Sequence, residues 1–502
     1  MQVEALISLA LYFVLMMAIG YYAYKKSTGN VAEYMLGGRQ LHPAVAALSA
    51  GASDMSGWML MGLPGAIYVS GMSSAWIAVG LLIGAYLNYK LVAPRLRAYT
   101  EIADDAITIP DYFEKRFKDK SRLLRVISSV VIVVFFTLYT SAGVVAGGKL
   151  FEASFGLSYE IGLFLTAGVV VAYTLFGGFL AVSLTDFVQG CIMFVALVTV
   201  PIVTYMVLGG MEPILTELNT IDPTLLQMTA GVTVVSVISS MAWGLGYFGQ
   251  PHIIVRFMAI ATLKEVRTAR YIGMSWMLVT LIGAVATGIL GLAYVTLTGA
   301  ELTDPETIFI LLSQVLFHPL VGGFLLAAIL AAIMSTISSQ LLVSSSSLTE
   351  DFYKHFVRRG ASQKELVLVG RLSVLAVSLI AIALAFDRSS TILSLVSNAW
   401  AGFGAAFGPL ILLSLFWRGM TRSAALAGMI TGAATVLIWI YAPFEINGMH
   451  PSAVMYEMVP GFALSLIATL VVGFMTRTPT SALTEDFDTM KEAMRTGVIT
   501  PK

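Results

Sequence analysis

The sequence predicts an all-α, polytopic membrane protein with about 13 transmembrane helices. Of its 502 residues, 58% are apolar and only 12% are charged, with a mean hydropathy of +0.86. Soluble domains carry about a quarter of charged residues. The apolar residues also gather in long blocks, each close to the roughly 20 residues that a helix needs to cross a bilayer. This pattern excludes a soluble enzyme, and the single cysteine, Cys191, excludes a disulfide scaffold or a Cys-ligated zinc protein.

The apolar blocks define about thirteen candidate spans, joined by short connections. In the first block the positive charges, Lys25 and Lys26, follow the apolar run, which favours a retained span over a cleaved signal peptide. The candidate spans cover residues 4–23, 44–70, 74–94, 123–153, 158–178, 186–208, 229–250, 270–298, 318–347, 366–386, 391–417, 422–442 and 454–475.

Basic residues indicate how these spans are oriented. With the N-terminus outside, 27 of the 29 Lys and Arg residues fall in inner loops or the tail, and only Lys149 and Arg388 fall outside. Because cytoplasmic loops carry the excess of Lys and Arg, we expect a periplasmic N-terminus and a cytoplasmic C-terminus. The cytoplasmic tail, 477–502, has a mixed-charge pattern that predicts a short helix or a disordered end.

The second span contains the polar string Ser49–Trp58, with Asp54 flanked by serines and glycines. An Asp at the centre of a membrane helix costs about 2.5–3.5 kcal/mol on insertion scales, so its presence needs a reason. One interpretation is an unwound stretch whose free carbonyls coordinate a cation. The alternative is that Asp54 hydrogen-bonds a neighbouring helix, with the small residues allowing close approach.

The seventh span ends in Trp243–Pro251, which holds three glycines and a proline within nine residues. A continuous α-helix is improbable through this string. Its aromatic residues, Trp243 and Tyr247, are interleaved with the glycines, which favours the wall of a cavity. The alternative is an aromatic belt at the membrane interface.

The ninth span contains Ala331–Gln340, in which four small residues share one helix face. They are Ala332, Ser335, Thr336 and Ser339. Two adjacent hydroxyl groups and a free carbonyl suit a hard monovalent cation that takes oxygen ligands. The alternative is a small-residue interface between helices.

The first two of these strings occupy corresponding places if the spans are grouped in fives. Spans two to six and seven to eleven then form two halves, and each half begins with a broken span. Paired Gly/Pro interruptions of this kind indicate an inverted-repeat transporter with a binding site near the membrane midplane. We therefore expect the domains 1–43, 44–208, 209–417, 418–476 and 477–502, of which the second and third are the repeats.

At these motifs the chain resembles the sodium/solute symporter family, and within it the proline branch. The string Phe176–Ala181 marks the family, and Ser49–Gly62 and Trp243–Arg256 resemble the proline branch. Further matching strings are Tyr34–Arg39, Ile109–Phe113, Ala331–Gln340 and Trp400–Gly408. The resemblance implies a LeuT-type five-plus-five inverted repeat in the inner membrane of a bacterial cell.

The resemblance also implies which residues bind the cargo. The sodium site would use main-chain oxygens of Ala52, Met55 and Ala332 and the hydroxyls of Ser335 and Thr336, with Asp54 supporting sodium binding nearby. The proline site would draw on Ser56, Gly57, Trp58, Tyr139, Trp243, Tyr247 and Pro251. Arg39 and Asp186 match charged positions that suit gating or orientation rather than ligation, and Ser339 departs from close relatives, which can carry Cys there.

We therefore expect secondary active uptake of L-proline driven by co-transported sodium ion, by alternating access and without an obligatory protein partner. Another small solute, such as a carboxylate, sugar or vitamin, is the main alternative, and a passive channel is a second. The spans contain no nucleophile–base pair or metal cluster, so an enzyme is not predicted. The zero net charge gives no attraction to nucleic acid, and the absence of a phosphate-binding glycine loop argues against ATP as the energy source.

Overall fold

The structure is a computed structural model that describes residues 3–26, 29–476 and 479–499. Within these ranges the regular structure is helical, and two isolated bridges are the only β pairings. The first helices are α1 (Val3–Lys26), α2 (Val31–Leu36), α3 (Pro43–Gly57), α4 (Leu63–Ser70), α5 (Ala75–Leu87), α6 (Ala93–Ile102), α7 (Ile109–Phe117), α8 (Leu123–Phe155), α9 (Tyr159–Val207), α10 (Met211–Ile221) and α11 (Val234–Met241). They continue with α12 (Pro251–Ala259), α13 (Leu263–Thr298), α14 (Ile308–Val315), α15 (Pro319–Ser346), α16 (Gln363–Ala385), α17 (Ile392–Phe416), α18 (Arg422–Tyr441), α19 (Pro451–Val454), α20 (Met458–Met475) and α21 (Ser481–Thr496).

Short 3-10 or π segments interrupt or join these helices. They are η1 (Gly37–Arg39), η2 (Trp58–Gly62), η3 (Gly71–Ser74), η4 (Asn88–Val92), η5 (Ala242–Gly249), η6 (Pro305–Thr307) and η7 (Ser347–Val357). Two of them, η2 and η5, fall in the two spans that the sequence predicts to be broken. The other five segments lie elsewhere along the chain, so η2 and η5 are the two that fall at the predicted breaks.

Ten stretches of the described chain are long and apolar enough to cross a membrane. Two of these stretches are long enough for two membrane crossings each: Pro43–Ile102 has 60 residues and Tyr159–Val207 has 49, far more than one crossing needs. Each of these contains two predicted spans. The predicted span 229–250 corresponds to the shorter apolar stretch Val234–Gly249. These three stretches account for the difference between ten and the thirteen spans that the sequence predicts.

The turn within α9 depends on a glycine. Gly178 has φ 58° and ψ −146°, a backbone conformation that side chains with a Cβ rarely adopt. A Cβ at this position would also lie 2.5 Å from the ring of Tyr34, so the space is filled. This explains why the string Phe176–Ala181 can divide one helical stretch into two spans.

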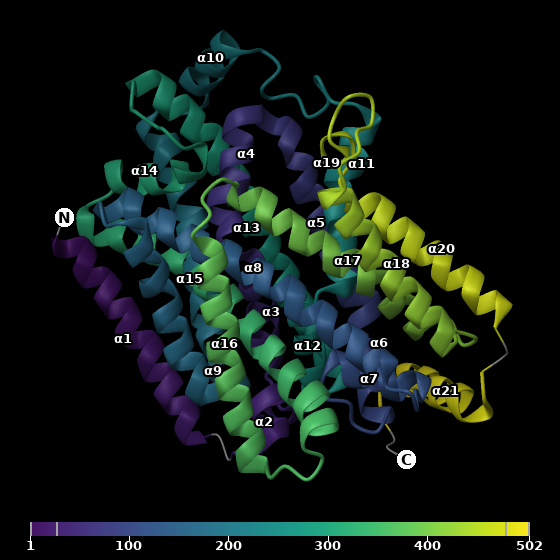
Figure 1. The fold of residues 1–502 in the computed structure, drawn as a ribbon. Helices are drawn as coiled ribbons and strands as arrows, with labels where there is room; N and C mark the ends of the chain where they lie inside the picture. Colours follow the sequence, from purple (N-terminus) through teal and green to yellow (C-terminus); the bar gives the residue numbers. More distant parts are fainter. Residues whose placement is uncertain (1–2, 27–28, 477–478, 500–502) are drawn as a thin grey trace.

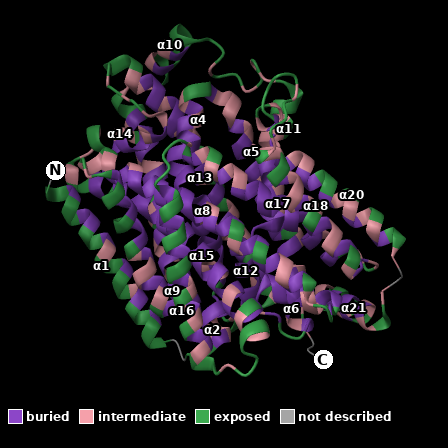
Figure 2. Cartoon of the chain, in the orientation of Figure 1, coloured by how far each residue is buried: buried purple, intermediate pink, exposed green. Residues whose placement is uncertain are grey.

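The centre of the bundle is formed by α3, α8, α15 and α17, and the other helices surround it (Figure 1). Figure 2 shows buried residues gathered in this centre and exposed residues along the outer sides of α1 and α20. The broken helix α3 packs against α9, α12, α13 and α15. A membrane-facing shell therefore encloses the two broken spans and the ninth span.

The two basic residues that the sequence places outside lie beside outer carboxylates. Lys149 Nζ is 3.0 Å from Glu306 and 3.3 Å from Asp304, and Arg388 is 2.5 Å from Glu152. Both are thus paired, in a region that the sequence already assigns to one side of the membrane.

The predicted tail contains helix α21, which lies against α6. The ring of Phe487 packs edge-on against Tyr99 at 6.3 Å, and Lys118 pairs with Asp486 at 3.2 Å. Of the two outcomes that the sequence allows for the tail, a helix and a disordered end, residues 481–496 adopt the helix. Residues 477–478 and 500–502 of the predicted tail lie outside the described ranges.

Candidate functional site

The second span breaks at Ser56. This residue has φ 43° and ψ −168° at the end of α3, and the π segment η2 follows directly. A non-glycine residue with such a φ is uncommon and marks a strained or functional position. The helix remains regular through Asp54, so the break is shorter than the polar string Ser49–Trp58 that predicts it. The Ser56 hydroxyl accepts a hydrogen bond of 3.4 Å from the Trp58 N–H across the break.

The seventh span breaks over a longer distance. Helix α11 changes into the 3-10 segment η5, Gln250 is extended at φ −81° and ψ 106°, and α12 begins at Pro251. Helix α17 fixes this break, because the Trp400 indole donates to the Trp243 carbonyl at 2.8 Å and Gln250 donates to the Trp400 carbonyl at 3.0 Å. The predicted interruption at Trp243–Pro251 is therefore present.

The predicted sodium ligands on the ninth span lie against the broken second span. The Ser335 hydroxyl donates to the Ala52 carbonyl at 2.7 Å and lies 3.1 Å from the Ala332 carbonyl. Thr336 Oγ1 lies 3.2 Å from the same Ala332 oxygen. These hydroxyl and carbonyl oxygens are buried, and they are the donor types that a hard cation accepts. The fifth predicted ligand, the Met55 carbonyl, accepts the N–H of Trp58 at the end of α3.

Asp54 lies beside this region and lines a small, mostly apolar cavity. The Tyr247 hydroxyl donates to Asp54 Oδ2, while Oδ1 has no partner among the described residues. The cavity has a volume of about 20 Å³ and is also lined by Asn88, whose amide is 1% exposed and likewise has no partner there. This space is enough for one water molecule. Asn88 is a site residue that the sequence analysis missed, although an isolated Asn in an apolar span is a signal of this kind.

The predicted substrate residues form an aromatic cluster around the two breaks. The ring centroids of Trp58 and Trp243 are 6.2 Å apart, and Tyr139 stands edge-on to His252, the residue after Pro251, at 5.9 Å. Ser56 and Gly57 form the break itself. Tyr247 contacts the same helix, two residues before the break, through its hydrogen bond to Asp54. All seven predicted substrate residues are buried or lie at the breaks: Ser56, Gly57, Trp58, Tyr139, Trp243, Tyr247 and Pro251.

Two further aromatic residues belong to the cluster and carry no predicted role. Trp400 stands edge-on to Tyr247 at 5.1 Å, and Tyr456 stacks on Trp243 at 5.3 Å. Trp400 lies in a string that the sequence analysis quotes as a family match. Tyr456 precedes α20, far along the chain, and nothing in its local sequence indicates this contact.

Asp186 occupies the centre of a buried polar cluster that joins four helices. Its carboxylate accepts from the Ser49 hydroxyl at 2.7 Å and from Arg256 at 3.2 Å. Arg256 also donates to Ser339 at 2.6 Å, and Ser339 lies 3.4 Å from Asp186. The cluster links α3, α9, α12 and α15. Ser339 is the residue through which α15 takes part in it. Arg256 carries no predicted role, although it ends the matching string Trp243–Arg256.

Arg39, the other predicted gating residue, lies apart from Asp186. It pairs with Asp105 at 2.7 Å and donates to the carbonyls of Met258 and Ala106 at 2.8 and 2.5 Å. Burial lowers the pKa of Arg39 from its ordinary value, and Asp105 acts in the opposite direction. Arg39 therefore ties the segment after α2 to the end of α12 and to the loop after α6.

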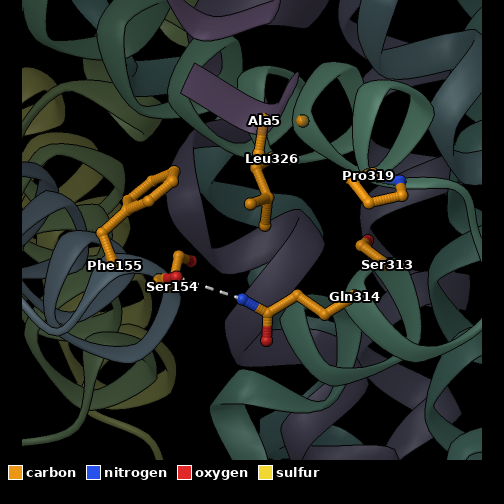
Figure 3. A pocket seen from close by; sticks show the side chains of 9 residues that line it. Ala5, Ser154, Phe155, Ser313, Gln314, Pro319 and Leu326 are labelled. Atoms are coloured by element: carbon orange, nitrogen blue, oxygen red, sulfur yellow. Dashed lines mark hydrogen bonds between the residues drawn. The ribbon is translucent and has the colours of Figure 1, made fainter. Parts of the chain in front are cut away.

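A larger cavity, of about 270 Å³, lies elsewhere, where α1, α14 and α15 meet (Figure 3). Ser154, Gln314 and Pro319 line it, and no predicted site residue does. The chemistry that the sequence predicts is thus concentrated around the helix breaks and not in this space.

The chain is similar to known proteins over most of its length. The model of the "Sodium:solute symporter family" matches residues 34–432. Among relatives, the osmoregulated proline transporter OpuE of Bacillus subtilis (strain 168) is 59% identical over 99% of both chains. The high-affinity proline transporter PutP of the same organism is 58% identical over 95% of this chain and 100% of its own. A sodium/proline symporter of Staphylococcus aureus (strain JH9) is 55% identical over 98% and 96%.

Solved structures are similar in fold. A Na⁺-coupled sialic acid symporter, in a substrate-bound outward-open state, matches with a TM-score of 0.80 at 19% identity over 95% of this chain and 99% of its own. A nucleobase-cation-symport-1 family transporter matches with a TM-score of 0.56 at 12% identity over 91% and 98%. At these identities the likeness concerns the fold alone.

Proposed function

Since this chain belongs to the sodium:solute symporter family, we propose that it imports L-proline together with sodium ion by alternating access. The observation that supports sodium binding is the contact between α15 and α3, where the Ser335 hydroxyl lies 2.7 Å from the Ala52 carbonyl. Relatives that are named as proline transporters and sodium/proline symporters, at 55–59% identity over nearly the full chain, support proline as the solute.

Sodium binds, in this proposal, between the broken second span and the ninth span. Its ligands are the carbonyls of Ala52, Met55 and Ala332 and the hydroxyls of Ser335 and Thr336. In the structure the hydroxyl of Ser335 makes a hydrogen bond to a carbonyl that the ion would share. When Na⁺ enters, the hydroxyl rotates its proton away and presents a lone pair, so the ion replaces a hydrogen bond rather than separating the helices. The carboxylate of Asp54 adds negative charge nearby.

Proline binds at the two breaks. Its carboxylate is an anion, and the backbone N–H groups that a half-helix leaves unpaired at its N-terminus favour such a group. Helix α12 supplies such an end: Pro251 has no N–H and the N–H groups of Ile253 and Ile254 bond to the Gln250 carbonyl, so the N–H of His252 is the one that its first turn offers. The flat apolar ring of proline suits the aromatic side chains of Trp58 and Trp243, which already lie against each other. Tyr139, Tyr247 and Gly57 complete the surrounding wall.

Coupling follows from the shared second span. Sodium ties α3 to α15 on one side of the Ser56 break, and proline uses the backbone and side chains on the other side. An ion that orders the break raises the affinity for proline, and by thermodynamic linkage proline raises the affinity for sodium by the same factor. Neither cargo alone completes the arrangement, so the two are carried together.

Two polar clusters serve as the cytoplasmic gate in this proposal. The buried group around Asp186 and Arg256 holds α12 against α3 and α15, and Arg39 holds the segment after α2 against α12. Backbone hydrogen bonds from Leu41 to Ala259 and from Ala261 to Leu41 close the same region. Opening to the cytoplasm requires these contacts to separate together.

The chain is a multi-pass membrane transporter. Its finer topology belongs to the proposal: a periplasmic N-terminus, a cytoplasmic C-terminus and residence in a bacterial inner membrane. The two repeats then extend over 44–208 and 209–417, preceded by 1–43 and followed by 418–476 and the tail 477–502.

Substrate competition tests the choice of solute. Cells or vesicles that contain the chain are given labelled L-proline and sodium, with an excess of unlabelled proline, a carboxylate, a sugar or a vitamin. We expect unlabelled proline to abolish the signal and the other solutes to leave it intact. Failure of unlabelled proline to compete at any concentration would refute proline as the cargo and leave the sodium site standing.

A further inference from the structure

Helices α1, α9 and α16 come together with α2 on one side of the bundle (Figure 1). Residues of these helices line two cavities. The first has a volume of about 280 Å³ and is an apolar groove between α1 and α9, lined by Met17, Gly20, Tyr21 and Ala172 among others. The second, of about 530 Å³, is polar. Both are lined by Tyr24 and Phe176, so the two cavities adjoin at these rings.

The groove faces outward from the bundle. Tyr21 is 60% exposed, Tyr24 48% and Phe176 51%, and all three lie on helices that cross the membrane. In a membrane protein the solvent at such a surface is lipid, and Tyr is enriched where the apolar core meets the headgroups. An acyl chain is therefore the natural occupant of the apolar groove.

The polar cavity, in contrast, presents fixed positive charge. Arg371 donates from Nε to the Leu175 carbonyl at 3.0 Å, and its guanidinium lies 5.6 Å from the ring centre of Phe176. Lys364 lies two turns earlier on α16 and lines the same cavity. At the end of α1, Lys25 Nζ lies 4.9 Å from the ring centre of Tyr21, which lines the groove. The backbone contact of Arg371 leaves the outer edge of its guanidinium available for an anion.

None of these three cations forms an ion pair within the described part of the chain. The acidic neighbour Glu365 is already engaged, by Arg358 at 3.0 Å and by the Tyr353 hydroxyl at 2.6 Å. Lys25 and Lys364 are exposed and Arg371 is half-buried, whereas the buried Arg125 contacts three carboxylates, those of Asp111, Glu114 and Asp351. These cations lie beside a groove that faces lipid. An anion from outside the chain can therefore neutralise their charge.

We propose that the two cavities together bind one anionic phospholipid. Its phosphate lies in the polar cavity near Arg371 and Lys364, with Lys25 at the rim, and one acyl chain lies in the groove between α1 and α9. Basic pockets between transmembrane helices are suited to anionic headgroups. The lipid would join α1 and α16 to α9, and both α1 and α16 also pack against α15, which carries Ser335. The site is separate from the proposed transport site and does not depend on which solute is carried.

Lipid binding to the purified full-length chain tests this site. Labelled phosphatidylglycerol is titrated into the protein in detergent, with phosphatidylcholine, inorganic phosphate and glycerophosphoglycerol as competitors. We expect one phosphatidylglycerol per chain, and phosphatidylcholine to compete at least tenfold less well. Glycerophosphoglycerol, which has the same phosphate without acyl chains, should compete about 100-fold less well, because burial of each methylene contributes strongly.

The double variant Lys364→Gln/Arg371→Gln should weaken phosphatidylglycerol binding about 20-fold and remove the preference over phosphatidylcholine. The control Lys120→Gln/Arg359→Gln removes the same charge from exposed residues that line neither cavity, and it should bind as the unchanged chain does. Ala172→Trp, which fills the groove, should weaken the binding of phosphatidylglycerol but leave any binding of inorganic phosphate unchanged.

Three results would overturn the proposal. Equal binding of phosphatidylglycerol and phosphatidylcholine would show that the cations do not select the headgroup. Equal loss in the two double variants would reduce the effect to net charge. Full displacement by inorganic phosphate would show that the cavity takes a free anion rather than a lipid. Sodium-dependent uptake is measured separately, so a failure here leaves the transport proposal untouched.

Discussion

Replacing Ser335 by alanine removes one oxygen from the place where the second and ninth spans meet. That oxygen lies 2.7 Å from the Ala52 carbonyl and 3.1 Å from the Ala332 carbonyl, in a fully buried position. A polar contact to a charged group contributes about 1.5–3 kcal/mol, which corresponds to about 10- to 150-fold in an equilibrium constant. We therefore expect Ser335→Ala to raise the half-saturating sodium concentration at least about tenfold.

The assay is the initial rate of labelled proline uptake as a function of external sodium, with the amount of protein in the membrane measured in parallel. Ser344→Ala is the matched control, because this serine is buried in the same helix and its hydroxyl has no partner among the described residues. Thr336→Ala should act in the same direction, and the double variant with Ser335→Ala should exceed either single change. Sodium dependence that stays within about twofold of the unchanged chain in Ser335→Ala would refute the ligand assignment.

Three further substitutions test the surroundings of the site. Asn88→Leu keeps the branched shape and the number of side-chain heavy atoms but removes the amide that faces the cavity beside Asp54, so we expect a folded protein that needs about tenfold more sodium in the uptake assay; an unchanged sodium titration would count against this role. Asp186→Asn leaves Arg256 buried without its counter-charge and should cost about 3–5 kcal/mol of unfolding free energy, seen as a lower thermal midpoint in detergent; an unaltered midpoint would contradict the pairing. Gly84→Ala would place a Cβ 2.2 Å from a backbone oxygen of η5, so we expect uptake to fall, and normal uptake would show that the segment can move aside.

The broken spans could be predicted because their cause is local. Three glycines and a proline within Trp243–Pro251 cannot support a regular helix, and the structure has a 3-10 segment there. The polar string Ser49–Trp58 likewise predicts a break in the second span. The residue at which it breaks was not predictable, because Ser56 has no intrinsic preference for positive φ and is held there by its surroundings.

Contacts between distant parts of the chain set the rest of the site. Asn88, Arg256, Trp400 and Tyr456 come from four different segments, and their pairing with predicted site residues depends on how the helices pack. The resemblance to a family, and no feature of the single sequence, predicts that residues of α3 and α15 share one sodium site. A single sequence shows which residues are unusual in a membrane, but not which of them meet.

Concentrative uptake in proteoliposomes tests the central claim most directly. The chain is reconstituted alone, with potassium inside and either sodium or potassium outside, and labelled L-proline is followed over time. We expect proline to accumulate above its external concentration only with the inward sodium gradient, and to leave the vesicles when an ionophore dissipates that gradient. Equilibration without accumulation, or equal uptake with potassium on both sides, would contradict sodium-coupled symport.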